Sequence, residues 1–218
     1  MHPYLEKYKL LFLNSNGFFK NVQKESEYWD VLKFYVIFTI VSQVISILLN
    51  LPTLMKESLF ISAMIFSLVG SVVFAFAVPF VSSGIVHLGV LVFKGKKGYF
   101  NTFKPITYAM TIGAAYNILS SLINGVYGWF NPLSIESLTS GLAQLEQNVA
   151  IVIVSGIIGI VSLIHILRTE ILGIGFYQGL TKAKALLSVV LVPLVLFIII
   201  GIIFGFSMAF SSSMFSAL

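Results

Sequence analysis

The chain has 218 residues, of which 58% are hydrophobic and 10% are charged, and its mean hydropathy is +0.99. Soluble domains average about 45–50% apolar and about 25% charged residues, so this composition excludes a water-soluble domain and indicates an integral membrane protein. The absence of cysteine excludes disulfides, thiol catalysis and cysteine-ligated metal sites. Lys and Arg outnumber Asp and Glu by 13 to 8, but they flank apolar runs instead of forming one patch, which argues against nucleic-acid binding.

Residues 1–30 contain no run that could span a bilayer, and their composition is not that of a signal peptide. Apolar residues follow helical spacing here, with the charged residues off that face; the first group is Tyr4, Leu5, Tyr8, Leu11 and Phe12. We predict one or two amphipathic helices, broken around residues 14–17. They lie on the cytoplasmic leaflet or pack on the cytoplasmic end of the bundle, and the two alternatives are compatible.

Five apolar segments follow, at about 32–50, 59–93, 105–130, 149–176 and 185–210, before a short tail at 211–218. A spanning helix needs about 20 mostly apolar residues. The second segment is far longer and would reach about 50 Å as a straight helix. It therefore forms one helix kinked near Pro79 that projects beyond the bilayer, or two short segments broken there.

The distribution of basic residues decides the number of spans. With five spans, one side of the membrane receives Lys7, Lys9, Lys20, Lys24, Lys33, Lys94, Lys96, Lys97, Lys104, Arg168, Lys182 and Lys184. Only Lys56 falls on the other side. Because cytoplasmic loops carry an excess of Lys and Arg, we predict an all-α bundle of five transmembrane helices with a cytoplasmic N-terminus and an external C-terminus. We expect it in the cell membrane of a bacterium or archaeon, as a multi-pass protein.

No constellation of catalytic residues emerges. Asp30, the only aspartate, precedes the first span, and no nucleophile-elbow, zinc-protease or phosphate-loop motif occurs. His87, His165 and Glu170 lack a metal-ligand spacing. We expect no enzymatic activity, no metal and no cofactor.

Polar side chains inside the second, third and fourth spans are more informative, because burying them in a membrane is costly. They are Ser83, His87, Asn117, Ser121, Asn124, His165 and Arg168. They form either hydrogen bonds between helices or a polar cavity for an ion, a small solute or a lipid headgroup. We favour hydrogen bonds, because no acidic residue lies near the middle of a span.

Two cytoplasmic turns carry lysines, one at about 94–104 and one at 182–184, and the first also has two glycines and two interfacial aromatics. Their candidate contact residues are Lys94, Lys96, Lys97, Tyr99, Phe100, Lys104, Lys182 and Lys184. They are ordinary turns whose lysines only set the membrane topology, or they contact anionic lipid headgroups or an acidic partner. Near an anionic leaflet each lysine contributes about 1 kcal/mol of attraction.

Three stretches resemble the Yip domain family, five-span membrane proteins named for their interaction with Ypt/Rab GTPases. They are Asn16–Val22 before the first span, Ile85–Leu88 with Lys94–Phe103 and Tyr108–Ala109, and Leu172–Ile174 with Gly179–Ala185. The third span departs from the family, since Thr111 and Ile112 stand where a proline is expected. Eukaryotic members bind Rab-type GTPases and lack enzymatic activity. The ratio of 12 lysines to one arginine, with abundant isoleucine, suggests an AT-rich microbial genome. The chain therefore looks like a member of the prokaryotic branch, and Rab binding is not expected here.

The resemblance and the residues together predict a non-catalytic membrane organiser or adaptor. Its cytoplasmic face contacts anionic lipid or a protein partner, with a homo-oligomer as a further possibility and no nucleic acid. The alternative is a transporter or translocator of a small solute, an ion or a lipid that uses the polar faces of spans two to four.

Overall fold

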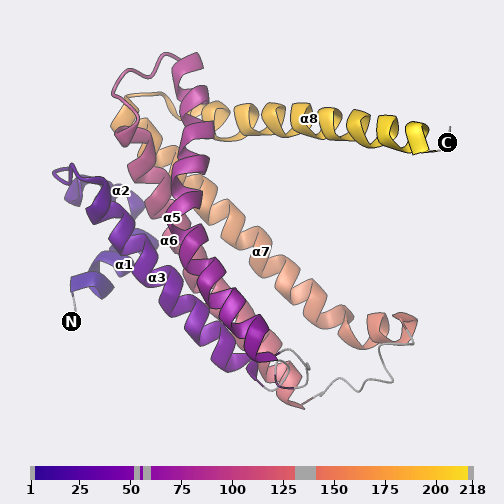
Figure 1. The fold of residues 1–218 in the computed structure, drawn as a ribbon. Helices are drawn as coiled ribbons and strands as arrows, with labels where there is room; N and C mark the ends of the chain where they lie inside the picture. The colour runs from indigo at the N-terminus through magenta and orange to yellow at the C-terminus, as the bar shows by residue number, and fades with distance from the viewer. Residues whose placement is uncertain (1–2, 52–54, 56–59, 131–140, 216–218) are drawn as a thin grey trace.

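The computed structural model describes residues 3–51, 55, 60–130 and 141–215 (Figure 1). Within these ranges the regular structure is entirely α-helical, which confirms the predicted class. The helices are α1 (Pro3–Leu13), α2 (Ser15–Asn21), α3 (Tyr28–Leu49), α5 (Phe60–Val92), α6 (Phe100–Phe130), α7 (Gly141–Gln178) and α8 (Lys182–Phe215). The last five are long and apolar enough to cross a membrane, so the prediction of five spans is also confirmed.

The predicted break in the N-terminal segment falls at Asn14. Its backbone is not helical, and its side-chain oxygen accepts a hydrogen bond from the Gly17 amide at 3.0 Å. Asparagine is among the preferred residues for this capping role, because it satisfies one of the free amides of a new helix. The chain therefore ends α1 and starts α2 within two residues.

The second apolar segment forms one helix, α5, that runs through Pro79 without a break in its assignment. Its 33 residues correspond to about 50 Å at 1.5 Å per residue, more than the hydrocarbon thickness of about 30 Å. Of the two alternatives left open by the sequence, the structure has the single long helix. The turn that follows it therefore lies beyond the apolar part of the span.

Helix α6 begins at Phe100, five residues before the predicted start of the third span at Pro105. The predicted span at about 105–130 lies within this helix, and the residues before Pro105 already belong to its first turn. The Thr102 and Phe103 amides both bond to the Tyr99 carbonyl at 2.9 Å. Residues 102–109 are all buried. They lie where the start of α6 meets α2, the start of α3 and the end of α7, and we call this region the packed end of the bundle.

Helices α3, α5 and α6 run side by side, whereas α7 meets them at its C-terminal end and separates toward Gly141 (Figure 1). Helix α8 leaves the bundle sideways (Figure 1). It touches α5 near its start, where a Cβ on Gly89 would lie 2.6 Å from the Ser188 carbonyl oxygen. Only glycine permits this approach, so the crossing of α5 and α8 depends on that residue.

The N-terminal helices pack on the flank of the bundle. The ring of Tyr8 stacks on Phe38 of α3 at 4.3 Å, and Phe12 contacts Tyr116 of α6 with ring centroids 5.7 Å apart. Leu11 is fully buried beneath them. Packing on the bundle is thus the alternative that the structure supports, while contact of the same segment with the leaflet stays a prediction.

Candidate functional site at the packed end of the bundle

A buried lysine stands at the centre of the packed end. Lys104 on α6 is 1% exposed, and its ammonium donates hydrogen bonds to the backbone carbonyls of Glu25 at 2.6 Å and Gln23 at 3.4 Å. Both carbonyls belong to the loop between α2 and α3. A buried ammonium needs such partners, because removing an ionised group from water costs several kcal/mol.

The Glu25 side chain extends this site into a network. Its carboxylate accepts hydrogen bonds from the Lys7 ammonium at 2.7 Å and from the Tyr108 hydroxyl, and Lys7 also donates to that hydroxyl at 2.8 Å. Lys7 and Glu25 form the one ion pair within the described ranges. The Lys7 ammonium lies 4.8 Å from the ring centroids of Phe34 and Tyr108, where cation–π attraction adds to the pair.

Helix α7 completes the network through Tyr177. Its ring lies 4.9 Å from the Lys104 ammonium, and its hydroxyl donates to the Phe19 carbonyl at 3.0 Å. One turn earlier, a Cβ on Gly173 would lie 2.4 Å from Pro105 and 2.6 Å from the Phe19 ring. We call Lys7, Glu25, Lys104, Tyr108 and Tyr177 the buried charge network. It joins the N-terminal segment to α6 and α7.

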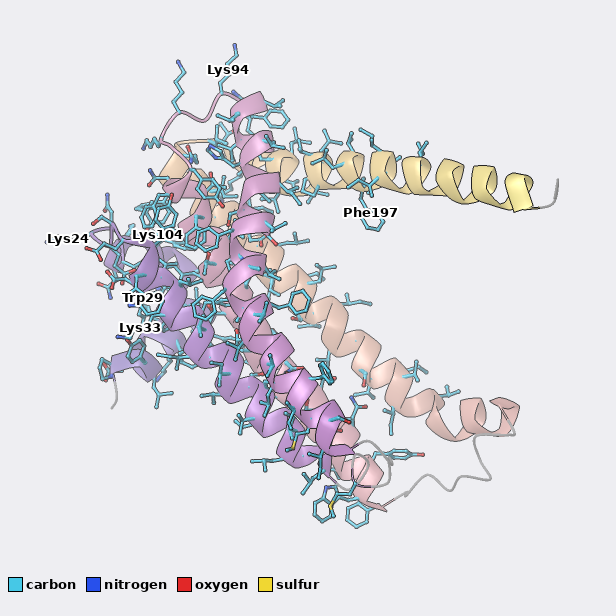
Figure 2. The ribbon with its side chains drawn as sticks, in the orientation of Figure 1. Lys24, Trp29, Lys33, Lys94, Lys104 and Phe197 are labelled. Carbon is cyan, nitrogen blue, oxygen red and sulfur yellow. The ribbon has the colours of Figure 1, made fainter. Side chains whose placement is uncertain are left out.

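Lys104 therefore differs from its predicted place on the lipid- or partner-contacting surface. Sequence position put it beside the basic turn, but the early start of α6 directs it into the packed end. Figure 2 shows Lys94 projecting beyond the helix ends while Lys104 lies among the side chains next to the α2–α3 loop. The charges that can contact a partner are consequently fewer than the sequence suggested.

The first basic turn is a helix stop built on Lys94, whose φ of 67° lies in the left-handed region. The amides of Lys94 and Gly95 bond back to the carbonyls of Leu91 at 3.0 Å and Val90 at 2.8 Å. This is the Schellman arrangement, in which the left-handed position usually holds glycine. Lysine at that position directs its side chain away from the helix.

Gln178 at the end of α7 holds the same turn. Its amide oxygen accepts the Lys97 amide at 3.0 Å, and its amide nitrogen donates to the Gly98 carbonyl at 2.9 Å and to the Thr102 hydroxyl at 3.0 Å. The turn at Gly179, with φ of 68°, follows directly and leads to the second basic turn, which is the first turn of α8 and carries Lys182 and Lys184. The two basic turns are therefore neighbours in space.

These two turns present a continuous set of exposed ammonium groups, which we call the basic face. It consists of Lys94, Lys96, Lys97, Lys182 and Lys184, all exposed. Within the described residues none of the five is in an ion pair. Their charges are therefore available to an external anion.

The aromatic residues of the first turn point inward instead. The Tyr99 hydroxyl donates to the Phe80 carbonyl at 2.7 Å, and burial raises the pKa of Tyr99. Phe100 meets the ring of Tyr28 edge-on at 4.8 Å. Both are half-buried, so they fix the turn against α3 and α5 while the lysines face outward.

The polar residues of the spans are distributed among separate contacts. Within the third span, Asn117 donates to Ser42 at 2.9 Å and Ser121 shares a hydrogen bond with Ser46 at 2.7 Å, both across to α3. Asn124 is exposed and accepts a hydrogen bond from Ser155 of α7 at 3.4 Å. These contacts join neighbouring helices.

The remaining polar residues lie nearer the packed end. The Nδ1 atom of His87 is 2.8 Å from the Thr102 hydroxyl, and that of His165 is 3.1 Å from the Tyr116 hydroxyl. Ser83 is fully buried, and its hydroxyl has no hydrogen-bond partner in the described part of the chain. Arg168 is exposed. The predicted residues thus lie in several places and do not converge on one site.

One polar cavity does lie between α3 and α6. It has a volume of about 200 Å³ and includes Asn117, the only member of the predicted set in its lining. The other lining residues are Tyr35, Thr39, Ser42, Gln43, Met110, Gly113 and Ala114.

Glu25, Tyr177 and Gln178 are important residues that sequence reasoning missed. Glu25 lies in a mixed-charge stretch, and Gln178 lies at the end of an apolar helix, so neither had a distinctive local pattern. Gly173, four residues before Tyr177, lies in one of the stretches that resemble a known family. That resemblance was the one sequence signal that pointed to this part of α7.

Comparison with known proteins gives one result. The Yip1 domain model matches residues 9–205, which includes the basic face, the five candidate spans and every residue of the buried charge network except Lys7. Comparisons with curated proteins and with solved structures found no match. The expected resemblance is confirmed, because the match covers most of the chain, and this multi-pass membrane protein belongs to the Yip1 domain family.

Proposed function

We propose that the protein is a non-catalytic membrane organiser or adaptor, and that its basic face contacts anionic lipid or an acidic protein partner. The observation that carries this proposal is the group of five exposed lysines without ion pairs on two turns joined by Gln178. Each lysine near an anionic surface contributes about 1 kcal/mol, so the face as a whole favours such a surface by about 5 kcal/mol.

The rigidity of the first turn also supports the proposal. Lys94 occupies a left-handed position at the helix stop, and the Lys97 backbone is bonded to Gln178. A fixed arrangement of charges loses less conformational entropy on binding than a flexible loop does.

The test uses the protein in discs of neutral lipid, mixed with anionic or neutral vesicles. We expect co-flotation with anionic vesicles that weakens with salt, as electrostatic contacts do. Replacing Lys94, Lys96 and Lys97 together with Gln removes about 3 kcal/mol and weakens binding by roughly two orders of magnitude. The matched control replaces the exposed lysines of the N-terminal segment, Lys9, Lys20 and Lys24. Equal losses in both triple variants would mean that net charge, and not the basic face, causes binding.

The same proposal places the N-terminus and the basic face in the cytoplasm of a bacterium or archaeon. The chain has no cysteine, so single cysteines can be introduced without background. We expect a cysteine at position 96 to be protected from an impermeant maleimide in intact cells, and a cysteine at position 55 to react. The reverse pattern would reject this orientation.

A second candidate function is passage of a small solute, ion or lipid, and the cavity beside Asn117 favours it. Its polar lining lies in the middle of the span region, between α3 and α6. We expect Asn117→Leu to abolish flux in reconstituted vesicles if this function is correct. Normal flux in a folded variant would reject it.

A further inference from the structure

A second cavity lies next to the buried charge network, between α1 and the beginning of α3. Its volume of about 350 Å³ is within the range of small-molecule sites. Its lining residues are Pro3, Tyr4, Lys7, Glu25, Asp30 and Lys33. It lies apart from the basic face, and its occupancy does not depend on the function proposed above.

One wall of this cavity is fixed. Both carboxylate oxygens of Glu25 are used by Lys7 and Tyr108. Lys7 has three N–H donors and uses two of them, on Glu25 and on the Tyr108 hydroxyl. One donor of a positioned ammonium is therefore left for a ligand.

The opposite wall carries two charges that are not paired. Asp30 and Lys33 are three residues apart on α3, a separation that places side chains on neighbouring positions of one helix face. Within the described residues, neither forms a hydrogen bond or an ion pair. The cavity thus offers an ammonium and a carboxylate side by side, with a lining that is neutral in total.

The depth of the two charges has a definite order. The apolar helix starts at Tyr28, so Asp30 is nearer the membrane surface and Lys33 is deeper by about 4.5 Å. Trp29, directly before Asp30 in the sequence, is 56% exposed, in the position of an interfacial aromatic. Figure 2 shows Trp29 and Lys33 on the part of α3 that lies beside α1. The basic group is therefore below the acidic group, at the level where a span enters the bilayer.

We propose that this cavity binds the headgroup of a zwitterionic aminophospholipid. Such a headgroup has a phosphate diester nearer the hydrocarbon and an ammonium nearer water, which matches the order of Lys33 and Asp30. The phosphate accepts hydrogen bonds from Lys33 and from the free N–H of Lys7, and the ammonium donates to Asp30. A purely anionic headgroup would leave its negative charge near Asp30 without a cation between them.

The experiment exposes the purified protein to an equal mixture of phosphatidylethanolamine and phosphatidylglycerol with identical acyl chains. Retained lipid is identified by native mass spectrometry. We expect retention of phosphatidylethanolamine over phosphatidylglycerol by about tenfold or more, because a hydrogen bond to a charged group has at least that effect. Asp30→Asn should remove the preference while phosphate binding persists. Lys33→Gln should weaken retention of both lipids about tenfold.

Lys24→Gln is the matched control, since it removes an exposed lysine from the adjoining loop outside the cavity lining. It should retain the wild-type preference. Equal retention of the two lipids by the wild-type protein, or unchanged retention in both cavity variants, would overturn the proposal. An equal loss in Lys24→Gln would do the same, because it would reveal a general charge effect.

A second arm separates a lipid headgroup from a free phosphate. With Trp129→Phe, Trp29 becomes the only tryptophan and its fluorescence reports on the cavity. Glycerophosphoethanolamine should change this fluorescence with saturation, whereas inorganic phosphate should not at the same concentrations. Equally tight saturation by inorganic phosphate would reject the headgroup assignment.

Discussion

Neutralising Glu25 tests whether the buried charge network holds the N-terminal helices in place. In Glu25→Gln the amide keeps the size of the side chain, but the Lys7 and Lys104 ammonium groups lose the negative charge between them. The Tyr108 hydroxyl also loses a charged acceptor. The variant therefore leaves two positive charges in a largely buried region without compensation.

The expected cost follows from burial. Breaking a fully buried ion pair costs about 3–5 kcal/mol, whereas a surface pair contributes about 0–1 kcal/mol. The side chains of Lys7 and Glu25 are 21% and 25% exposed, so the pair lies between these limits. We expect a loss of about 2 kcal/mol, which increases the population with undocked N-terminal helices by roughly 30-fold.

Limited trypsin digestion measures this loss directly. Lys20 and Lys24 lie in the segment that the network holds, and both are exposed enough to be cleaved once it detaches. The initial cleavage rate should rise by roughly 30-fold in Glu25→Gln, and thermal unfolding should begin at a lower temperature. Glu6→Gln is the control, because Glu6 is an exposed carboxylate on α1 and makes the same change in charge.

A cleavage rate in Glu25→Gln equal to that of the Glu6 control would refute the reasoning. A double-mutant cycle adds a second criterion. Since Tyr108 donates directly to Glu25, the pair Glu25→Gln and Tyr108→Phe should show a coupling of about 1 kcal/mol. Simple additivity would mean that the hydrogen bond does not contribute.

Three further predictions concern separate features of the fold. Gly89→Val should destabilise the protein by about 1–3 kcal/mol, because the valine side chain would clash with the Ser188 backbone. It should also increase the distance between α5 and α8 measured with spin labels. The control Gly84→Val, which has open space around the site, should leave the stability and the distance unchanged. Lys94→Gly should raise the free energy of unfolding by up to about 1 kcal/mol, because glycine tolerates the left-handed position. Thermal unfolding measures this gain as a slightly higher midpoint, and a clear loss of stability would contradict it. Burial raises the pKa of Tyr8 to about 12, so the folded state favours the neutral phenol. The free energy of unfolding should therefore be constant up to about pH 10, the pKa of the unfolded chain, and fall between pH 10 and 12. Tyr8→Phe should flatten this fall, and the same pH profile in the variant would contradict the prediction.

The number of spans could be predicted because its signals are local. Each span is recognisable from length and hydropathy alone, and placing the lysines around Lys94 on the same side as the N-terminal lysines required an even number of crossings between them. The same reasoning failed at Lys104. Charge patterning treats every lysine as solvated, whereas the early start of α6 places this one under the α2–α3 loop.

The network itself depends on long-range contacts that no sequence spacing reveals. Lys7 and Tyr108 are 101 residues apart in the sequence, and Phe19 and Tyr177 are 158 residues apart. Hydrogen bonds between such residues follow from how helices pack, which is decided by small residues such as Gly173. By contrast, the pairing of Asn117 with α3 agrees with the favoured interpretation of the polar residues as interhelical contacts.

The wide sequence separation within the network has a consequence for biosynthesis. The Glu25 carbonyl is held by a lysine made 79 residues later, and the Phe19 carbonyl by a tyrosine made 158 residues later. At about 5–20 residues per second, these partners emerge roughly 4–16 s and 8–32 s after the groups they hold. The first helices to leave the ribosome are therefore among the last to reach their final position, because α6 and α7 must be inserted before they can dock.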